Sequence, residues 1–255
     1  MNEITSIADF LKHLQDDNIE TGFYRGHSDK NYVIKPSLGR NPKKFNDWLF
    51  EIDINNEELS DMQRKSIGLQ QYEWWALSEF KARKIPYHSK NLNYFDLMIL
   101  AQHHGLRTRL LDVTTNPLVA LYFACDDNSK DGELIIFDKS WQKMKTMKTG
   151  VNDEIPQMIG SDIRSFLLFI RTIDNYTFVR PSHLSSRIIS QDGNFIMFKQ
   201  PLQEIEEESR IIRYLILKEN KVKLKSELKK LGFVKSKLFP ELNSVASEID
   251  FDLFN

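Results

Sequence analysis

The sequence has a single cysteine and lacks any long apolar run. Because Cys125 has no second thiol to pair with, no disulfide can form within the chain, and this suits a reducing compartment. No run of about 18 apolar residues is present, and the first residues lack the basic and apolar regions of a signal peptide. We therefore expect a cytoplasmic protein that neither spans nor binds a membrane.

An excess of charge of one sign is also lacking. The chain carries 35 Lys and Arg residues against 36 Asp and Glu residues, which gives a formal net charge of −1. Proteins that bind nucleic acids through bulk charge are strongly basic, so this balance argues against that class. A local basic patch is still compatible with a net charge near zero.

Several common catalytic motifs are missing. No glycine-rich phosphate loop follows an expected strand, which disfavours doubly wound dinucleotide-binding folds and P-loop enzymes. The sequence contains no HExxH motif, no paired Cys/His spacing and no Gly-x-Ser-x-Gly elbow. We therefore expect no metal site and no serine hydrolase.

The most informative stretch that is present runs from Tyr94 to Cys125 and contains two helical patterns. Asn93 is a suitable N-cap for the first helix, and Gly105 stands where a left-handed helix end is expected. Asn116 caps the second helix, which is apolar on every side and must therefore be buried. Burial raises the pKa of a thiol, so we expect Cys125 at the end of this helix to be unreactive.

Polar side chains are concentrated between these two helices. An unsatisfied polar group carried into a core costs about 1–3 kcal/mol, so each must find a partner. Either the side chains satisfy one another or they line a ligand cleft. They are Gln102, His103, His104, Arg107, Thr108, Arg109, Asp112, Thr114, Thr115 and Asn116.

Elsewhere, helices and strands follow one another without regular alternation, which predicts an α+β fold. Residues 42–85 are helical in pattern, with Trp75 on an apolar stripe that we expect to be core. Further expected helices begin at Ser6 and Pro240 and cover 163–173 and 222–231, the last with Leu231 inward. The expected strands or extended segments are 21–27, 31–35, 133–137, 177–180, 195–198, 210–217 and 233–238.

The central stretch resembles the signature of the FRG domain family, QHxGxxTxLLDxTxxPxxALxFA. The matching residues are Gln102, His103, Gly105, Thr108, Leu110, Leu111, Asp112, Thr114, Pro117, Ala120, Leu121, Phe123 and Ala124. Other family elements are similar to Tyr24-Arg25-Gly26, Pro36-Ser37-Leu38, Arg187 to Gln191-x-Gly193-x-Phe195, and Phe239-Pro240-Glu241-Leu242. The resemblance covers roughly residues 20 to 250.

The FRG family has been likened to ADP-ribosyltransferase folds, and this resemblance implies an architecture. It implies a mixed, mainly antiparallel split sheet with flanking helices around a cleft. Residues 1–255 would form a single FRG-like domain with a helical insertion at 42–85.

The resemblance also implies an NAD-using enzyme, an ADP-ribosyltransferase or NAD glycohydrolase. In such a site Arg25 grips the dinucleotide, Thr114 or Thr115 supplies a hydroxyl, and Glu241 or Glu248 is the catalytic acid. No Glu-x-Glu or Gln-x-Glu motif lies near the last strands, so Glu133 and Asp112 are further candidates for the acid. The implied NAD-binding residues are Tyr24, Arg25, Gly26, Gln102, His103, Thr108, Asp112, Asn116, Arg187 and Gln191.

Related proteins recur in bacterial and phage conflict systems, which implies an anti-phage defence effector or toxin that modifies an unknown macromolecular acceptor. Two alternatives stay open: a non-catalytic module that recognises a nucleotide or other ligand, and a nucleic-acid effector that uses the eight lysines between Lys218 and Lys237. Arg25 and Asp112 also have structural interpretations. Arg25 could pair with a surface carboxylate, and Asp112 with Arg25, Arg107 or Arg109.

Overall fold

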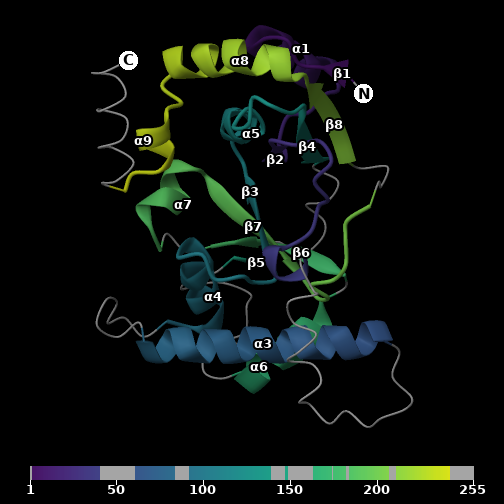
Figure 1. The fold of residues 1–255 in the computed structure, drawn as a ribbon, viewed down its shortest axis with the longest axis vertical. Helices are drawn as coiled ribbons and strands as arrows, with labels where there is room; N and C mark the ends of the chain where they lie inside the picture. Colours follow the sequence, from purple (N-terminus) through teal and green to yellow (C-terminus); the bar gives the residue numbers. More distant parts are fainter. Residues whose placement is uncertain are drawn as a thin grey trace.

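An eight-stranded sheet runs through the middle of the molecule, in the order β1-β8-β4-β2-β3-β7-β6-β5 (Figure 1). The computed structural model describes residues 2–40, 61–83, 92–138, 147–148, 163–173, 175–181, 184–206 and 211–241. The strands are β1 (Asn2–Glu3), β2 (Gly22–His27), β3 (Leu110–Thr114), β4 (Gly132–Asp138), β5 (Met147–Lys148), β6 (Tyr176–Arg180), β7 (Gly193–Phe198) and β8 (Ile211–Ile216).

The sheet is mainly antiparallel. The outer pairs β1–β8 and β5–β6 are parallel, and the five pairs between them are antiparallel. The helices are α1 (Ile7–Asp16), η1 (Ser37–Gly39), α3 (Asp61–Arg83), α4 (Tyr94–His103), α5 (Pro117–Ala124), α6 (Ile163–Thr172), α7 (Ser186–Ser190), α8 (Lys218–Lys230) and α9 (Lys235–Leu238). The predicted mixed α+β fold is confirmed; its likeness to ADP-ribosyltransferases stays a prediction.

The sheet is nearly divided between β2 and β3. These two fully described strands share one register pair, Tyr24 with Thr114, whereas β2 and β4 share six pairs and β3 and β7 share five. We call β1-β8-β4-β2 the first half-sheet, β3-β7-β6-β5 the second half-sheet, and the place where they diverge the split.

Each half-sheet has its own helices and its own core. Helices α1, α5 and α8 pack on the first half-sheet, while α3, α4 and α6 lie at the end formed by the second (Figure 1). A third cluster lies on the opposite face and joins the halves, for example through the stacked rings of Phe23 and Phe178, whose centroids are 4.5 Å apart. Side-chain packing therefore compensates for the missing backbone ladder.

Local signals set the helix ends as predicted. Asn93 accepts a hydrogen bond from the backbone N–H of Asp96, and the Asn116 side chain accepts from the first turn of α5. Gly105, with φ of +89°, follows α4 in the left-handed conformation that glycine adopts without a steric penalty. Caps depend on a few adjacent residues, which explains why these boundaries could be predicted.

Helix α5 rests directly on strand β2. A Cβ atom added to Gly26 would lie 2.0 Å from the carbonyl oxygen of Ala120 and 2.5 Å from the backbone nitrogen of Ala124. Glycine therefore permits this close approach. Ala120, Leu121 and Ala124 are fully buried, as predicted for a helix without a polar face.

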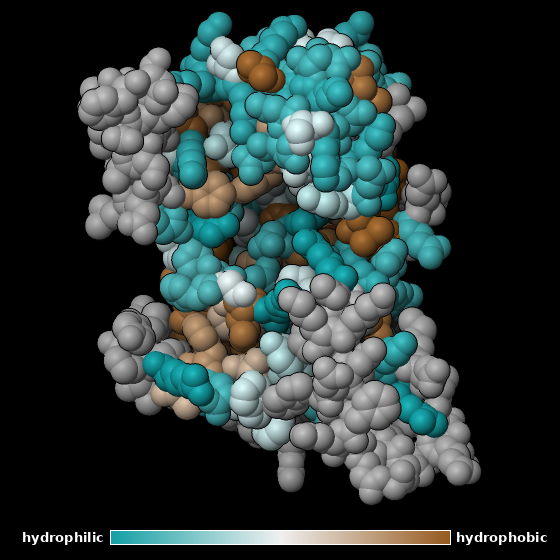
Figure 2. Space-filling model, in the orientation of Figure 1, coloured by the Kyte–Doolittle hydropathy of each residue, from teal (hydrophilic) through white to brown (hydrophobic). Residues whose placement is uncertain are grey.

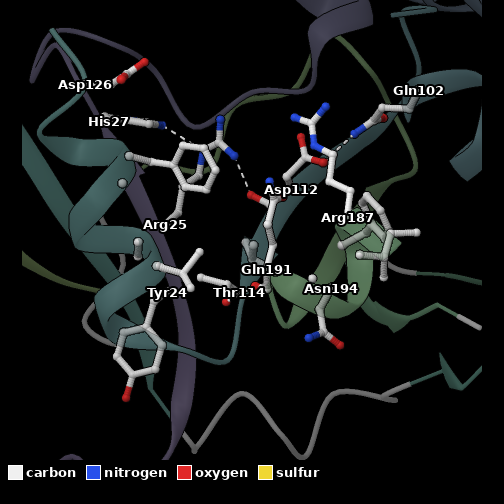
Figure 3. Close-up of a pocket in the computed structure, with 18 of the residues that line it drawn as sticks. Tyr24, Arg25, His27, Gln102, Asp112, Thr114, Asp126, Arg187, Gln191 and Asn194 are labelled. Carbon is white, nitrogen blue, oxygen red and sulfur yellow. Dashed lines mark hydrogen bonds between the residues drawn. The ribbon is translucent and has the colours of Figure 1, made fainter. Parts of the chain in front are cut away.

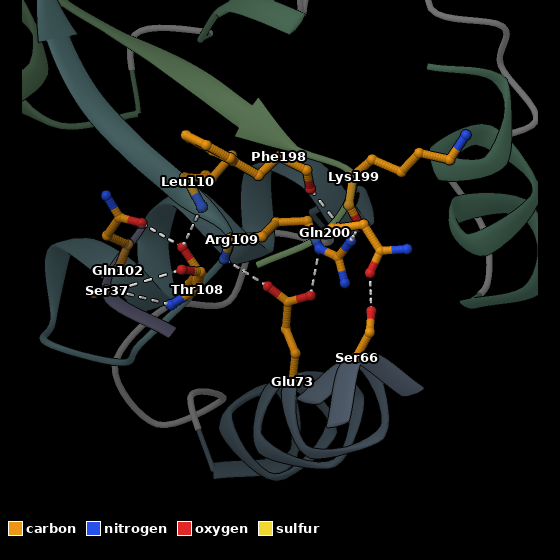
Figure 4. Close-up of polar contacts among 10 residues, drawn as sticks. All are labelled: Ser37, Ser66, Glu73, Gln102, Thr108, Arg109, Leu110, Phe198, Lys199 and Gln200. Atoms are coloured by element: carbon orange, nitrogen blue, oxygen red, sulfur yellow. Dashed lines mark hydrogen bonds and ion pairs between the residues drawn. The ribbon is translucent and has the colours of Figure 1, made fainter. Parts of the chain in front are cut away.

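A buried ion pair fixes α3 to the sheet (Figure 4). The Arg109 Nε donates to Glu73 Oε2 at 2.6 Å, and the Arg109 backbone N–H donates to Glu73 Oε1 at 2.8 Å. The Arg109 Nη1 also donates to the carbonyl oxygens of Phe198 and Lys199. Both charges are thus paired and hydrogen-bonded, which burial of an ion pair requires. Of the predicted helical region 42–85, residues 42–60 and 84–85 lie outside the described ranges.

The predicted burial of Trp75 is wrong, since its side chain is 44% exposed. Leu69 and Ala76, which belong to the same predicted stripe, are buried, and Glu73 and Leu77 complete the buried face of α3. Trp75 was assigned to this face because the pattern gave no sign that a charged residue, Glu73, occupies a core position. The inward orientation predicted for Leu231 is also wrong, because this side chain is 54% exposed.

Two predicted extended segments differ from the structure. Residues 233–238 do not form a strand; they contain the short helix α9. The outer edge of β8 is already paired with β1, so the segment has no place beside that strand. Residues 31–35 form a turn and irregular chain rather than a strand. The helix predicted from Pro240 onward lies almost wholly outside the described residues.

We predict that Glu73→Gln lowers the free energy of unfolding by about 3–5 kcal/mol, because it leaves the buried Arg109 charge without its counterion. Urea denaturation followed by circular dichroism measures this. The control is Arg83→Ala, which removes the exposed Arg83–Glu79 pair from the same helix and is expected to cost about 0–1 kcal/mol. Equal losses for the two variants would contradict the assignment.

Candidate functional site

A cavity of about 360 Å³ lies at the split. Residues of β2, β3, α4, α5, α7 and β7 line it, so both half-sheets contribute to its wall. Figure 2 shows that the molecule is hollowed at mid-height on the face seen there, with hydrophilic residues around hydrophobic ones. The volume lies within the range of about 300–1,000 Å³ that is typical of small-molecule sites.

The described lining carries more positive than negative charge. Arg25, Arg40 and Arg187 line the cavity together with Asp112 and Asp126. Asp126 is already paired with Lys225 outside the lining, at 3.2 Å. The arrangement therefore favours an anionic ligand, which guanidinium groups bind well because they are always charged and donate several hydrogen bonds in a plane.

Arg25 bridges the split. Its Nη1 donates to the backbone oxygen of Asp112 in β3, and its Nε donates to His27 Nε2 at 2.9 Å (Figure 3). Removal from water lowers the pKa of Arg25 to about 10; the carboxylate of Asp112 opposes this shift and the charge of Arg40 adds to it. The guanidinium is therefore still charged at neutral pH.

Behind Arg25, a buried histidine and glutamate form the next contacts. His27 Nδ1 lies 3.0 Å from Glu133 Oε1, and both side chains are 2% exposed. Arg213 Nη1 donates to both oxygens of Glu133, at 2.9 and 2.8 Å. Burial lowers the pKa of His27, and the hydrogen bond that His27 donates to the Glu133 carboxylate opposes that shift. Glu133, a candidate acid in the sequence, is thus committed to His27 and Arg213.

Asp112 presents its side chain to the cavity and is oriented from α4. Gln102 Nε2 donates to Asp112 Oδ1 at 3.0 Å, and the Thr108 hydroxyl donates to Gln102 Oε1 (Figure 4). Thr108 is fully buried and does not line the cavity. Of the arginines considered as partners of Asp112, Arg25 contacts its backbone, while Arg109 pairs with Glu73.

The threonines before α5 have different positions. Thr114 lines the cavity, but its hydroxyl donates to the Gln191 oxygen at 2.7 Å and accepts from the Asn116 N–H at 2.9 Å. Thr115 is exposed and lies outside the lining. Asn116 also lies outside it and caps α5. Thr114 therefore joins β3 to α7 and to the start of α5.

Two late sequence motifs meet at one end of the cavity. The Arg187 guanidinium lies 4.5 Å from the centroid of the Phe239 ring, and Phe239 packs edge-on against Phe123, with ring centroids 5.8 Å apart. Glu241 Oε1 lies 3.9 Å from His103 Nε2, although Glu241 itself is not part of the lining. Phe123, Arg187 and His103 all line the cavity.

The structure thus gathers most of the sequence-derived candidates around one cavity. Nine of them line it: Tyr24, Arg25, Gly26, Gln102, His103, Asp112, Thr114, Arg187 and Gln191. Five do not: Thr108, Thr115, Asn116, Glu133 and Glu241. Glu248 lies outside the described residues.

Sequence reasoning missed several polar lining residues, among them His27, Arg40, Asp126 and Asn194. His27 stands two residues after Arg25, a spacing that puts both side chains on the same face of a strand and could have identified it. Arg40 and Asn194 carried no such signal. Asn194 is 5% exposed, and within the described residues its Oδ1 has no hydrogen-bond partner.

Several lysines of the 218–237 segment have structural contacts. Lys221 is fully buried and donates to the carbonyl oxygens of Ser28 and Asp127. Lys223 donates to the Thr5 oxygen, and Lys225 pairs with Asp126. These contacts reduce the number of lysines that a nucleic acid could reach.

Within the described ranges, no three His, Cys, Asp or Glu side chains are grouped so that they could hold a metal ion. The helices in that part of the chain include none that is both long and apolar enough to cross a membrane.

The FRG domain family model matches residues 20–133, which confirms the resemblance over that stretch. The match contains β2 and the segment from α4 to α5, whereas Arg187, Gln191 and Phe239 lie beyond it. Neither the search of curated proteins nor the search of solved structures found a match.

We predict that Cys125 is inert in the native protein. The residue is fully buried, and burial raises the pKa of its thiol to about 12 from an ordinary value of 9.0, so very little thiolate is present at neutral pH. A chromogenic disulfide reagent is expected to label the native chain far more slowly than the chain in urea. Rapid labelling without denaturant would contradict this.

Proposed function

We propose that this chain, an FRG domain protein over residues 20–133, binds NAD in the cavity at the split and breaks the bond between its nicotinamide and its ribose. The observation that supports this most directly is the meeting of Arg25, Arg40 and Arg187 with the carboxylate of Asp112 around one cavity. The cations suit the pyrophosphate, and the carboxylate suits a sugar that becomes positively charged.

For binding, Arg25 retains several donors. A guanidinium has five N–H groups, and two of those of Arg25 are used on His27 and on the Asp112 backbone. The remaining N–H groups of Arg25, with those of Arg40 and Arg187, match phosphate oxygens, which accept such forked contacts. The half-buried ring of Phe123 offers an aromatic face for a base.

For the reaction, the bond between the nicotinamide nitrogen and ribose C1′ breaks, and its electron pair leaves with neutral nicotinamide. The ribosyl cation is stabilised by the Asp112 carboxylate, which Gln102 holds in place. Water or a hydroxyl, amine or other nucleophile of an acceptor then bonds to C1′ and loses a proton. With water the product is ADP-ribose, and with a macromolecule it is the ADP-ribosylated acceptor. Either outcome suits a toxin or an anti-phage defence effector.

A second candidate function is recognition of a nucleotide without turnover. The Thr114 hydroxyl favours it, because this group already donates to one backbone atom and accepts from another. A hydroxyl that already donates one hydrogen bond and accepts another can bind a substrate only if one of those two bonds breaks.

The test uses NAD labelled in the ADP-ribose part, with calorimetry for binding and chromatography for nicotinamide. We expect Arg25→Lys to weaken NAD binding about 10- to 100-fold, because one forked contact worth about 1.5–3 kcal/mol is lost. Asp112→Asn is expected to keep NAD binding within a few-fold but to slow nicotinamide release about a hundredfold.

Arg83→Lys and Asp131→Asn, which lie outside the lining, serve as matched controls and are expected to behave like the wild type. Binding without nicotinamide release would favour the recognition module. The NAD hypothesis is lost if the wild-type chain neither binds NAD nor releases nicotinamide.

A further inference from the structure

A chain of side-chain hydrogen bonds crosses the first half-sheet and ends at the split. It runs from Arg213 in β8 to Glu133 in β4, then to His27 and Arg25 in β2, and finally to the backbone oxygen of Asp112 in β3. These four strands are neighbours in that order, and His27 lies directly opposite Glu133 in the register. Arg25 is therefore held from behind by a defined set of partners.

The partners of His27 determine its protonation state. Arg25 Nε–H can only donate, so His27 Nε2 must provide a lone pair. The Glu133 carboxylate, which carries two contacts from Arg213, can only accept, so His27 Nδ1 must carry the proton. The contacts therefore require a neutral ring with the proton on Nδ1.

We propose that neutral His27, oriented by Glu133, is the positioning residue that holds Arg25 across the split, and that protonation of His27 releases Arg25 and weakens anion binding in the cavity. The identification of the anion as NAD rests on the proposed function. The positioning of Arg25 does not.

Protonation of His27 removes the Nε2 lone pair that accepts from Arg25, and it also places a positive ring beside the positive Arg25 guanidinium. A protonated His27 faces the cations Arg25 and Arg40, while the carboxylate that contacts it among the described residues, Glu133, is shared with Arg213. The other titratable group against the ring is Tyr32, whose ring packs edge-on at 5.9 Å. Burial lowers the pKa of His27 below its ordinary value of 6.5, so the neutral ring is fully present above that pH and is lost as the pH falls through the lowered pKa.

The direction in which anion affinity changes with pH distinguishes this proposal from simple charge attraction between the cavity and the anion. His103, Asp112 and Asp126 also line the cavity, and protonation of any of them makes the cavity more positive. Simple charge attraction therefore predicts tighter anion binding in acid. Release of Arg25 predicts weaker binding.

The first experiment needs no ligand. Nitrogen-15 NMR of the intact chain follows the imidazole of His27 and the Nε–H of Arg25, assigned with His27→Gln and Arg25→Lys. At about pH 7.5 we expect the Nδ1–H tautomer and a slowly exchanging Arg25 Nε–H, which broadens or shifts as His27 titrates. An Nε2–H tautomer, a charged ring at that pH, or an Arg25 signal that ignores the titration would overturn the proposal. The wild-type titration alone decides this if a variant does not fold.

The second experiment measures NAD affinity from about pH 7.5 to about pH 5, a range in which the charge of NAD does not change. The wild type is expected to lose at least about tenfold in affinity while circular dichroism shows that it stays folded. His27→Gln is expected to lose the pH dependence, whatever its affinity at the upper pH, because an amide both accepts from Arg25 and donates to Glu133 without titrating.

Tighter wild-type binding in acid, or a variant as pH-dependent as the wild type, would contradict the proposal. Absence of NAD binding at every pH would remove the proposed function, and the Arg25 resonance would then decide the positioning role by itself.

Discussion

The site depends on one side chain that spans a gap between two strands. Beyond the Tyr24–Thr114 pair, β2 and β3 diverge, and the backbone oxygen of Asp112 has no ladder partner in β2. Arg25 donates a hydrogen bond to this oxygen. The same guanidinium presents its remaining N–H groups to the cavity. Arg25 therefore both contacts β3 across the split and contributes positive charge to the cavity.

The residues of the family signature divide between the cavity wall and its support. Gln102 and Asp112 face the cavity, whereas Thr108 orients Gln102 from within the core and Asn116 starts the helix that lies on β2. The hydrogen bonds from Thr108 to Gln102 and from Gln102 to Asp112 hold these side chains in the arrangement seen here. A site whose side chains are held in place can bind a ligand without first rearranging them. Arg187, beyond the matched stretch, also lines the cavity and lies near Asp112 and Gln102 (Figure 3).

The sequence predicted those parts of the structure that depend on neighbouring residues. Caps such as Asn93 and the left-handed Gly105 act within one helical turn, and the fully apolar α5 could only be buried. It did not predict features set by distant partners. The role of His27 depends on Glu133, 106 residues away, and the burial of Glu73 depends on Arg109. Likewise, residues 233–238 have strand-like composition, but the edge of β8 is occupied by β1 from the other end of the chain.

The split also has a mechanical consequence. In a continuous sheet, a change in the distance between two strands breaks several backbone hydrogen bonds together. Here the separation of β2 and β3 past Tyr24 is set by the rotamer of Arg25 and by the packing of rings such as Phe23 on Phe178. A substitution that shortens one of these side chains is therefore expected to change the width of the cavity without breaking a backbone hydrogen bond within either half-sheet.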